Sequence, residues 1–204
     1  MGPAEAEARL RRALAAGRDG PSGGATSDGD LPGAVPPPEP LRPAAVLVAV
    51  DLSGPEARVL LTKRAAHLRH HPGQVAFPGG RLDPGDDGPV AAALREAAEE
   101  VALPRGSAEV LGTFGPHATI TGFSVTAVVA LLRGPFQPVP ERGEVEEAFF
   151  VPLAALMDLG RYRVERRRWR GAWRPYWVVP HGPHYVWGAT ARMLRALAER
   201  MEGA

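Results

Sequence analysis

Runs of apolar residues, separated by turns that contain glycine and proline, fill the chain from residue 44 onward. Four runs have the length and the composition of buried strands: residues 44–50, 57–61, 123–132 and 148–151. A further hairpin is expected within residues 161–179. Together these segments predict a mixed sheet.

Two stretches change to helical spacing. Residues 89–102 predict a helix that begins at Pro89, because proline is tolerated at a first helical position, and that ends before Pro104. At roughly 100° per residue, one side of this helix is an apolar stripe that can pack on a sheet. The stripe consists of Val90, Leu94, Ala97, Ala98 and Val101. Residues 188–201 predict a closing helix, so the pattern indicates an α/β fold with helices on both faces of the sheet.

The first 40 residues differ from the rest. Residues 1–16 contain a short amphipathic helix with Leu10 and Leu14 on one side. Residues 17–40 are rich in Gly, Pro, Ser and Asp, include PPPEP, and have too few apolar residues to fold alone. We therefore expect a disordered linker over residues 17–40 and one catalytic domain over residues 41–204.

Composition narrows the class of protein. The 204 residues carry a net charge of +1, which argues against a dedicated nucleic-acid or membrane-surface binder. The absence of cysteine excludes disulfides, thiol catalysis and cysteine metal sites. No run of eighteen apolar residues and no hydrophobic signal core occur, so we expect a cytoplasmic protein without a membrane partner.

The helix at residues 89–102 concentrates negative charge on its polar side. Glu96, Glu99 and Glu100 fall within one turn, where like charges weaken a helix unless a cation joins them. Carboxylate oxygens suit Mg²⁺ or Mn²⁺, ions that also bind phosphates. Arg95 lies four residues before Glu99 and can orient a carboxylate. A solvated acidic face remains the alternative for this segment taken alone.

The segment REAAEEVAL at residues 95–103 resembles the second half of the Nudix box, a glycine and a glutamate followed by REUxEExGU with U aliphatic. Arg95, Glu96, Glu99, Glu100 and Leu103 match this pattern. Three positions depart from it: the box glutamate corresponds to Asp87, the box glycine to Arg81 with Gly80 one place early, and the late glycine to Ala102. The resemblance implies a Nudix α/β/α sandwich and a metal bound by Glu96, Glu99 and Glu100.

A second motif stands just upstream, LLTKRAAHLRHHPGQVAFPGG at residues 60–80. It resembles the signature of the coenzyme A pyrophosphatase branch of the Nudix hydrolases, and weaker resemblance extends over residues 41–200. Arginine forks suit the several phosphates of coenzyme A, so Arg64 and Arg69 are candidate substrate ligands. Pairing of these arginines with Asp83, Asp86 or Asp87 is the alternative. Lys63 and the backbone amides of Gly79 and Gly80 are further candidates for binding phosphate.

The resemblance implies Mg²⁺- or Mn²⁺-dependent hydrolysis of coenzyme A, or of its acyl or oxidised derivatives, to 3′,5′-ADP and the 4′-phosphopantetheine half. Arg95 and Glu99 are the expected catalytic residues within the helix, and Glu144 is the leading candidate for the base, ahead of Glu146 and Glu147. Two other functions stay open: hydrolysis of another nucleoside diphosphate derivative such as NADH or ADP-ribose, and nucleotide binding without catalysis. His67, His70 and His71 fit a surface or phosphate-contacting role better than a zinc site.

Residues 166–170 form a basic cluster, RRRWR, followed by Trp173, Tyr176 and Trp177. Arginines interleaved with aromatic rings can bind RNA, but one cluster in a nearly neutral chain supplies few phosphate contacts. A solvated hairpin face, an adenine pocket and a homodimer interface remain alternatives.

Overall fold

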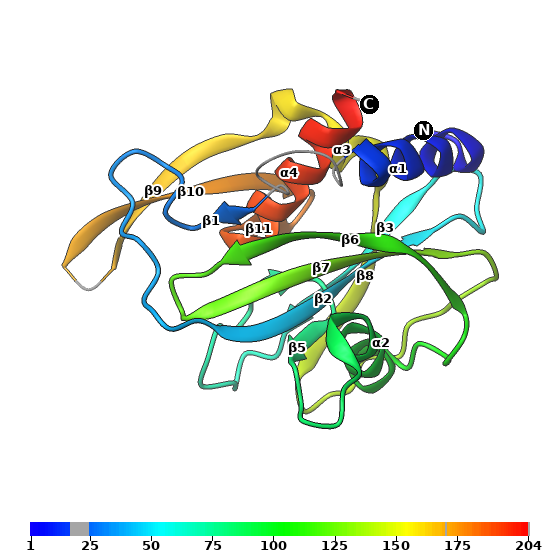
Figure 1. Ribbon diagram of the computed structural model, residues 1–204, viewed down its shortest axis with the longest axis horizontal. Coiled ribbons are helices and arrows are strands. Elements are labelled where there is room, and N and C mark those ends of the chain that lie inside the picture. Colours follow the sequence, from blue (N-terminus) through cyan, green and yellow to red (C-terminus); the bar gives the residue numbers. More distant parts are fainter. Residues whose placement is uncertain (17–24, 170, 204) are drawn as a thin grey trace.

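A computed structural model of the chain describes residues 1–16, 25–169 and 171–203. Its centre is a sheet of eight strands that lies between helices (Figure 1). The strands are β1 (Thr26–Ser27), β2 (Arg42–Asp51), β3 (Arg58–Arg64), β4 (Val75–Ala76), β5 (Gly79–Arg81), β6 (Ala108–Ala118), β7 (Phe123–Leu132) and β8 (Val145–Pro152).

The sheet is mixed and it divides near the functional residues. β2 and β7 run parallel in its centre, and β6 lies antiparallel on the outer side of β7. On its other side β2 pairs with two different strands: with β3 near its end, through Val50 and Asp51, and with β5 near its start, through residues 44–46. β3 then pairs with β4 and β8. β3 and β5 therefore pair with different parts of β2, and the end of β3 does not pair with the glycines of β5.

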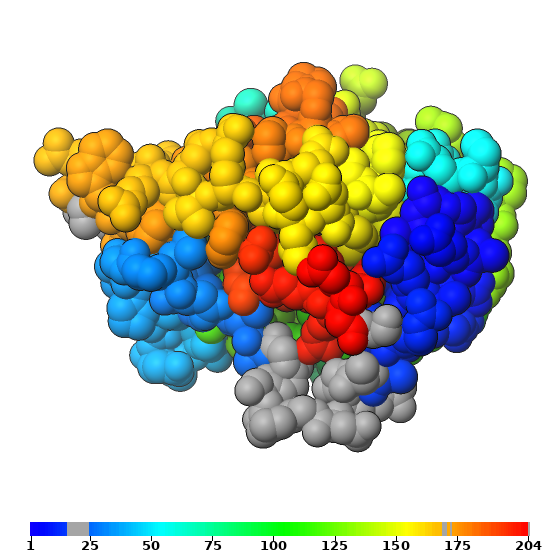
Figure 2. Space-filling view, turned by 90° about the horizontal axis from the view of Figure 1, so that it is seen from above, coloured from blue at the N-terminus to red at the C-terminus, as the bar shows by residue number. Residues whose placement is uncertain are grey.

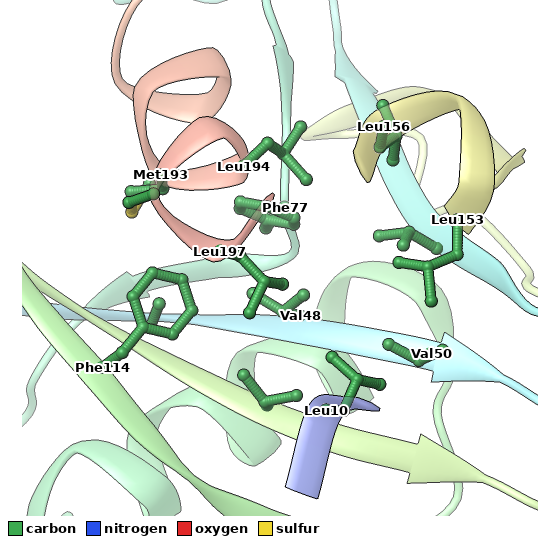
Figure 3. Close-up of a cluster of buried hydrophobic side chains, with 14 of the residues drawn as sticks. Leu10, Val48, Val50, Phe77, Phe114, Leu153, Leu156, Met193, Leu194 and Leu197 are labelled. Carbon is green, nitrogen blue, oxygen red and sulfur yellow. The ribbon is translucent and has the colours of Figure 1, made fainter. Parts of the chain in front are cut away.

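Two apolar cores cover the two faces. On one face, α2 (Gly88–Val101) packs Ala92, Ala93, Ala97 and Val101 against alternate residues of β2 and β7. The other face is covered by α1 (Pro3–Ala16), α3 (Leu153–Met157) and α4 (Ala189–Glu202), which lie side by side in Figure 2. Figure 3 shows leucines of α1, α3 and α4 converging on β2 in this larger core. The result is the helix, sheet, helix arrangement that the sequence pattern predicted.

A second, smaller sheet extends beyond one end of the main sheet (Figure 1). It consists of β9 (Arg163–Trp169), β10 (Ala172–His181) and β11 (His184–Trp187), all antiparallel, and a short 3₁₀ helix, η1 (Leu159–Arg161), precedes it. β11 lies beside β4 of the main sheet. The hairpin expected within residues 161–179 is confirmed, and the third strand is an addition to it.

The predicted strands and both long helices are present with small shifts at their ends. The sequence pattern missed β6 because Gly112, Gly115 and Pro116 interrupt it, and the register with β7 shifts twice along this strand. It also missed α3, β11 and the short strands β1, β4 and β5, which contain too few residues to show a period. Gly79 and Gly80, whose amides are candidates for binding phosphate, lie in β5 and pair with β2.

Composition indicated a linker over residues 17–40, of which residues 17–24 lie outside the described residues. Residues 26–30 are held against the domain by polar contacts rather than by apolar ones. β1 pairs in parallel with β6, and the buried His117 contacts the Thr26 hydroxyl at 2.8 Å and the Asp28 carboxylate at 3.2 Å. α1 likewise buries Ala6, Leu10 and Ala13 in the larger core. In the part of the chain that the structure describes, no helix is long and apolar enough to span a membrane.

Candidate active site

The packing of α2 decides where its glutamates lie. Because its alanine-rich stripe is buried against the sheet, Glu96, Glu99 and Glu100 are turned toward β5 and the segment that leads into β8. Their exposure differs greatly within this single turn: the side chain of Glu99 is 61% exposed, whereas Glu100 is 5% exposed. The three carboxylates therefore share a face but have different surroundings.

Glu100 is the buried carboxylate of the group. Burial raises its pKa to about 8, because a low-dielectric environment disfavours the charged form. The amide of Gly79 donates a hydrogen bond to Glu100 Oε2 at 3.3 Å and the charge of Arg64 favours ionisation, so both partly oppose that rise. Gly79 has no room for a side chain, since an added Cβ would lie 2.4 Å from the carbonyl oxygen of Ala45.

Glu96 lies against Gly80, the next residue of β5. An added Cβ on Gly80 would stand 2.4 Å from Glu96 Oε1, a distance that real Cβ atoms essentially never show. Burial also raises the pKa of Glu96, while its contact with Arg95 opposes that rise. Of the two glycines that we expected at a phosphate, Gly80 thus makes room for the Glu96 carboxylate, whereas Gly79 allows close approach to the backbone of β2.

Arg95 holds the acidic residues together. Its Nη1 lies 3.0 Å from Glu96 Oε1 and 3.1 Å from Glu99 Oε2. Its Nε and Nη2 donate to the two oxygens of Asp86 at 3.1 and 3.0 Å, a bidentate arrangement. These hydrogen bonds raise the pKa of Arg95 and lower that of Asp86. Arg95 therefore contacts the carboxylates of Glu96 and Glu99 and remains charged.

Five glutamates line a hollow of about 80 Å³, namely Glu96, Glu99, Glu100, Glu141 and Glu144. Glu144, the residue before β8, lines this hollow, and its charge raises the pKa of both Glu96 and Glu100. Oxygen-only ligands that carry this much negative charge fit a hard divalent cation. The carboxylate oxygens do not yet point at one common position. Among the described residues, no group of three or more His, Cys, Asp or Glu is arranged to hold a metal. In this arrangement Arg95 donates hydrogen bonds to one oxygen of Glu96 and one oxygen of Glu99.

The basic residues of the upstream motif separate at the end of β3. Arg64 lies on the side of α2, close enough for its charge to act on Glu100, and its buried Nε has no hydrogen-bond partner within the described part of the chain. Arg69 is exposed in the loop that follows, and it makes no hydrogen bond or ion pair within the described residues. Two of the three aspartates considered as partners for these arginines pair with Arg95 instead, namely Asp83 and Asp86.

Lys63 does not reach the glutamate hollow. Its ammonium group pairs with Glu146 at 2.6 Å, and its side chain lines a second hollow, on the face of the sheet opposite α2, together with Glu147. Glu146 and Glu147, the secondary candidates for the base, are thus turned toward Lys63 and His184. Of the three candidate bases, Glu144 is the one that lies beside the glutamates of α2.

Two residues of the site were missed by the sequence reasoning. Asp86 is the carboxylate that binds Arg95, whereas the motif alignment pointed to its neighbour Asp87, which caps the start of α2 without a side-chain hydrogen bond. Glu141 accompanies Glu144 in the hollow, and its amide donates to the carbonyl of Glu100 at 2.9 Å. The spacing of an acidic residue three positions before Glu144, in a turn, is a signal that could have found it. His67, His70 and His71 are exposed on the loop after β3.

The described residues of the basic cluster lie in β9, on the small sheet. Arg166, Arg167 and Arg168 are exposed, whereas Arg170 and the side chain of Trp169 lie outside the described residues. Trp173 is 66% exposed, but Trp177 packs against the larger core beneath Arg195, whose guanidinium is 4.2 Å from its ring. The aromatic residues thus do not form one stacking surface with the arginines.

Comparison with known proteins gives consistent matches. The NUDIX domain family matches residues 41–172. The uncharacterized Nudix hydrolase NudL of Salmonella paratyphi B is 45% identical over 157 residues, which cover 77% of this chain and 81% of that protein. The crystal structure of the MutT protein from Methanosarcina mazei Go1 is similar with a TM-score of 0.52 and 18% identity, over 80% of this chain and 94% of that one, a likeness of fold. The Nudix hydrolase RenU of M. smegmatis has 31% identity and a TM-score of 0.47, over 57% of this chain and 74% of that one.

Proposed function

Because this chain belongs to the Nudix hydrolase family, we propose that it hydrolyses the phosphoanhydride bond of coenzyme A or of an acyl or oxidised derivative. The products are 3′,5′-ADP and the corresponding 4′-phosphopantetheine. One observation carries the assignment of a phosphoanhydride substrate: Arg64, from the motif at residues 60–80, stands beside the glutamate hollow with a buried Nε that has no hydrogen-bond partner among the described residues. A buried donor without an acceptor is costly, and a phosphate oxygen would satisfy it. The choice of coenzyme A among such substrates rests on the resemblance of that motif and on Arg69.

The metal ligands in this proposal are Glu96, Glu99 and Glu100. Bound Mg²⁺ or Mn²⁺ would neutralise the diphosphate and lower the pKa of a water ligand. Burial of Glu100 fits such a role, since a cation in the hollow would stabilise the carboxylate form that burial disfavours. Arg95 holds the oxygens of Glu96 and Glu99 within about 3 Å of its own nitrogens and positions both carboxylates.

The proton of the attacking water needs an acceptor close to the metal ligands. Glu144 lines the same hollow but belongs to a different segment, so it can move independently of α2. Its partners in the fold are backbone atoms: its amide donates to Glu141 at 3.1 Å, and its carbonyl accepts from Ala65 at 2.9 Å. These hydrogen bonds hold the backbone of Glu144 in place, and its carboxylate is available to accept the proton.

Arg64 and Arg69 bind the phosphates of the substrate. Arg64 is held by main-chain hydrogen bonds to Gln74 and Gly73, both 3.0 Å, and addresses the scissile diphosphate. Arg69, exposed in the loop between β3 and β4, addresses the separate 3′-phosphate that distinguishes coenzyme A from ADP-ribose and NADH. The adenosine half of coenzyme A is therefore expected to lie toward this loop.

Two arginine variants test the assignment against the other Nudix substrates. Arg69→Ala should raise KM for coenzyme A about tenfold and leave ADP-ribose unaffected, because a charge-assisted contact contributes roughly 1.5–3 kcal/mol. Arg64→Ala should lower kcat/KM for both. Arg12→Ala, on the exposed side of α1, is the control for a lost surface charge. Equal effects of Arg69→Ala on both substrates would contradict the coenzyme A assignment and favour a different nucleoside diphosphate derivative. If no substrate is turned over, the binding-only function remains.

A further inference from the structure

A second hollow, of about 320 Å³, lies between the main sheet and the small sheet. The end of β3 contributes Lys63 to it, β8 contributes Glu147, and the hairpin around β11 contributes His184, Tyr185 and Trp187. Its size falls within the range of small-molecule sites, about 300–1,000 Å³. Three side chains with flat rings therefore share with Lys63 and Glu147 a space that could take part of a ligand.

The rings are held in place before any ligand arrives. His184 stacks on Phe149 of β8, with ring centroids 3.6 Å apart and planes inclined by 10°. Trp187 meets the edge of Tyr176 at 5.2 Å, and the guanidinium of Arg167 lies 5.0 Å from its ring. Rings that are fixed in this way lose little conformational freedom when a planar group stacks on them.

The polar groups of this hollow are also constrained. Glu147 Oε1 lies 3.6 Å from His184 Nε2, and the side chain of Glu147 is 45% exposed, so its second oxygen is accessible. Lys63 is held by Glu146. The hollow thus presents a carboxylate acceptor beside stacked rings, which suits a planar heterocycle that bears an amino group.

The two hollows are connected through the chain. Arg64 and Lys63 are neighbours at the end of β3 and address the glutamate hollow and the second hollow respectively. Glu144 and Glu147 stand three residues apart at the start of β8, which corresponds to roughly 10 Å along a strand. Because the two hollows lie on opposite faces of the sheet, a nucleotide that occupies both must pass around the edge formed by the end of β3 and the start of β8.

We propose that the second hollow binds the nucleobase of the substrate, an adenine-type purine, with Trp187 and His184 stacking on it and Glu147 accepting a hydrogen bond from its exocyclic amino group. This inference rests on the proposed function, because it assigns the adenosine half of the substrate to this face and leaves the pantetheine half outside. The pantetheine half is a flexible aliphatic amide chain, which cannot stack on the three fixed rings of this hollow. Trp187 and Glu147 are then specificity-determining residues that do not act on the scissile bond.

The test measures binding without turnover. Adenosine 3′,5′-bisphosphate contains no phosphoanhydride bond, so its Kd for the full chain can be measured by calorimetry with Mg²⁺ present. Trp187→Leu should weaken binding about tenfold or more, since stacking on one base contributes roughly 1–3 kcal/mol. Trp173→Leu, which removes an exposed tryptophan outside the hollow, should leave Kd unchanged.

Glu147→Gln is a second variant that leaves the packing intact. It should weaken binding of adenosine 3′,5′-bisphosphate several-fold, and it should change binding of the inosine analogue little, because hypoxanthine has no exocyclic amino group. A preference for adenine over hypoxanthine that survives Glu147→Gln would overturn the hydrogen bond. Circular dichroism of each variant verifies that the fold is retained.

The outcomes separate this inference from the proposed function. Binding of the bisphosphate that depends on Trp187, without hydrolysis of coenzyme A, would uphold the base site and refute the proposed reaction. Hydrolysis of coenzyme A with no effect of Trp187→Leu or Glu147→Gln on either Kd or KM would uphold the reaction and overturn the base site. Binding of 4′-phosphopantetheine that is weakened by Trp187→Leu would assign the hollow to the other half of the substrate, and thereby also overturn it.

Discussion

Replacing Glu100 by glutamine tests the electrostatic account of the glutamate hollow. Glu100 is 5% exposed, and its pKa rises from 4.5 to about 8 because of burial. The folded protein without metal therefore binds a proton at pH values where the unfolded chain has released it. Since stability falls with pH wherever the folded state binds more protons, the protein without metal should lose stability between about pH 4.5 and pH 8.

The size of this loss follows from the pKa. At about 1.4 kcal/mol per pKa unit, a rise from 4.5 to about 8 corresponds to at most about 5 kcal/mol of unfolding free energy. Water penetration and side-chain movement relieve part of the penalty, so we expect about 2–3 kcal/mol. Glutamine has the same shape, stays neutral and can accept the hydrogen bond of the Gly79 amide. Glu100→Gln should therefore match the wild type near pH 5 and exceed its stability by that amount near pH 8.

Urea denaturation in EDTA between pH 5 and pH 8.5 measures the difference, and repetition in Mg²⁺ measures the contribution of the cation. Mg²⁺ should stabilise the wild type most at high pH and should have little effect on Glu100→Gln, whose hydrolytic activity should also be lost. Glu99→Gln, at a 61% exposed side chain, is the matched control and should show no comparable pH-dependent gain. If the stability of the wild type relative to Glu100→Gln stays constant from pH 5 to pH 8.5, burial does not raise the pKa of Glu100.

Three further substitutions examine how the site is held together. Gly80→Ala would place a Cβ 2.4 Å from the Glu96 carboxylate and should lower kcat at least tenfold, whereas Gly85→Ala, with nothing within 4 Å, should be neutral; steady-state kinetics distinguishes them. Arg95→Lys keeps the charge but loses the bidentate contact with Asp86, so kcat should fall about tenfold and the Mg²⁺ concentration for half-maximal rate should rise. Ala102 ends α2 with φ 57° and ψ 35°, the left-handed region that glycine favours, so Ala102→Gly should stabilise the protein by about 0.5–1 kcal/mol in urea denaturation. An unchanged or lower denaturation midpoint for that variant would argue against strain at this position.

The sequence predicted α2 well because several independent signals agree there. Pro89 marks its start, the alanine-rich stripe gives the helical period, and three glutamates occupy the remaining side. The face that carries Glu96, Glu99 and Glu100 follows from that period alone. That Glu100 is buried while Glu99 is exposed does not follow, because it depends on how closely β5 approaches the helix.

Contacts between distant segments explain the other differences. Lys63 and Arg64 are adjacent basic residues that the sequence alone does not distinguish. The register shift between them in β3 places Lys63 at the second hollow and Arg64 on the side of the glutamate hollow. Asp86 and Asp87 are likewise neighbouring aspartates, but the loop before α2 brings Asp86 into contact with Arg95. Within residues 25–40, polar contacts to His117 rather than apolar runs tie the segment to the sheet, so a composition rule could not detect the attachment.

Hydrolysis of coenzyme A by the purified full chain with Mg²⁺ or Mn²⁺, with products identified by mass, is the most direct test of the central claim. We predict release of 3′,5′-ADP and 4′-phosphopantetheine, with kcat/KM well above the values for NADH and ADP-ribose and with loss of turnover in EDTA. Intact coenzyme A, together with turnover of NADH or ADP-ribose under the same conditions, would contradict the claim.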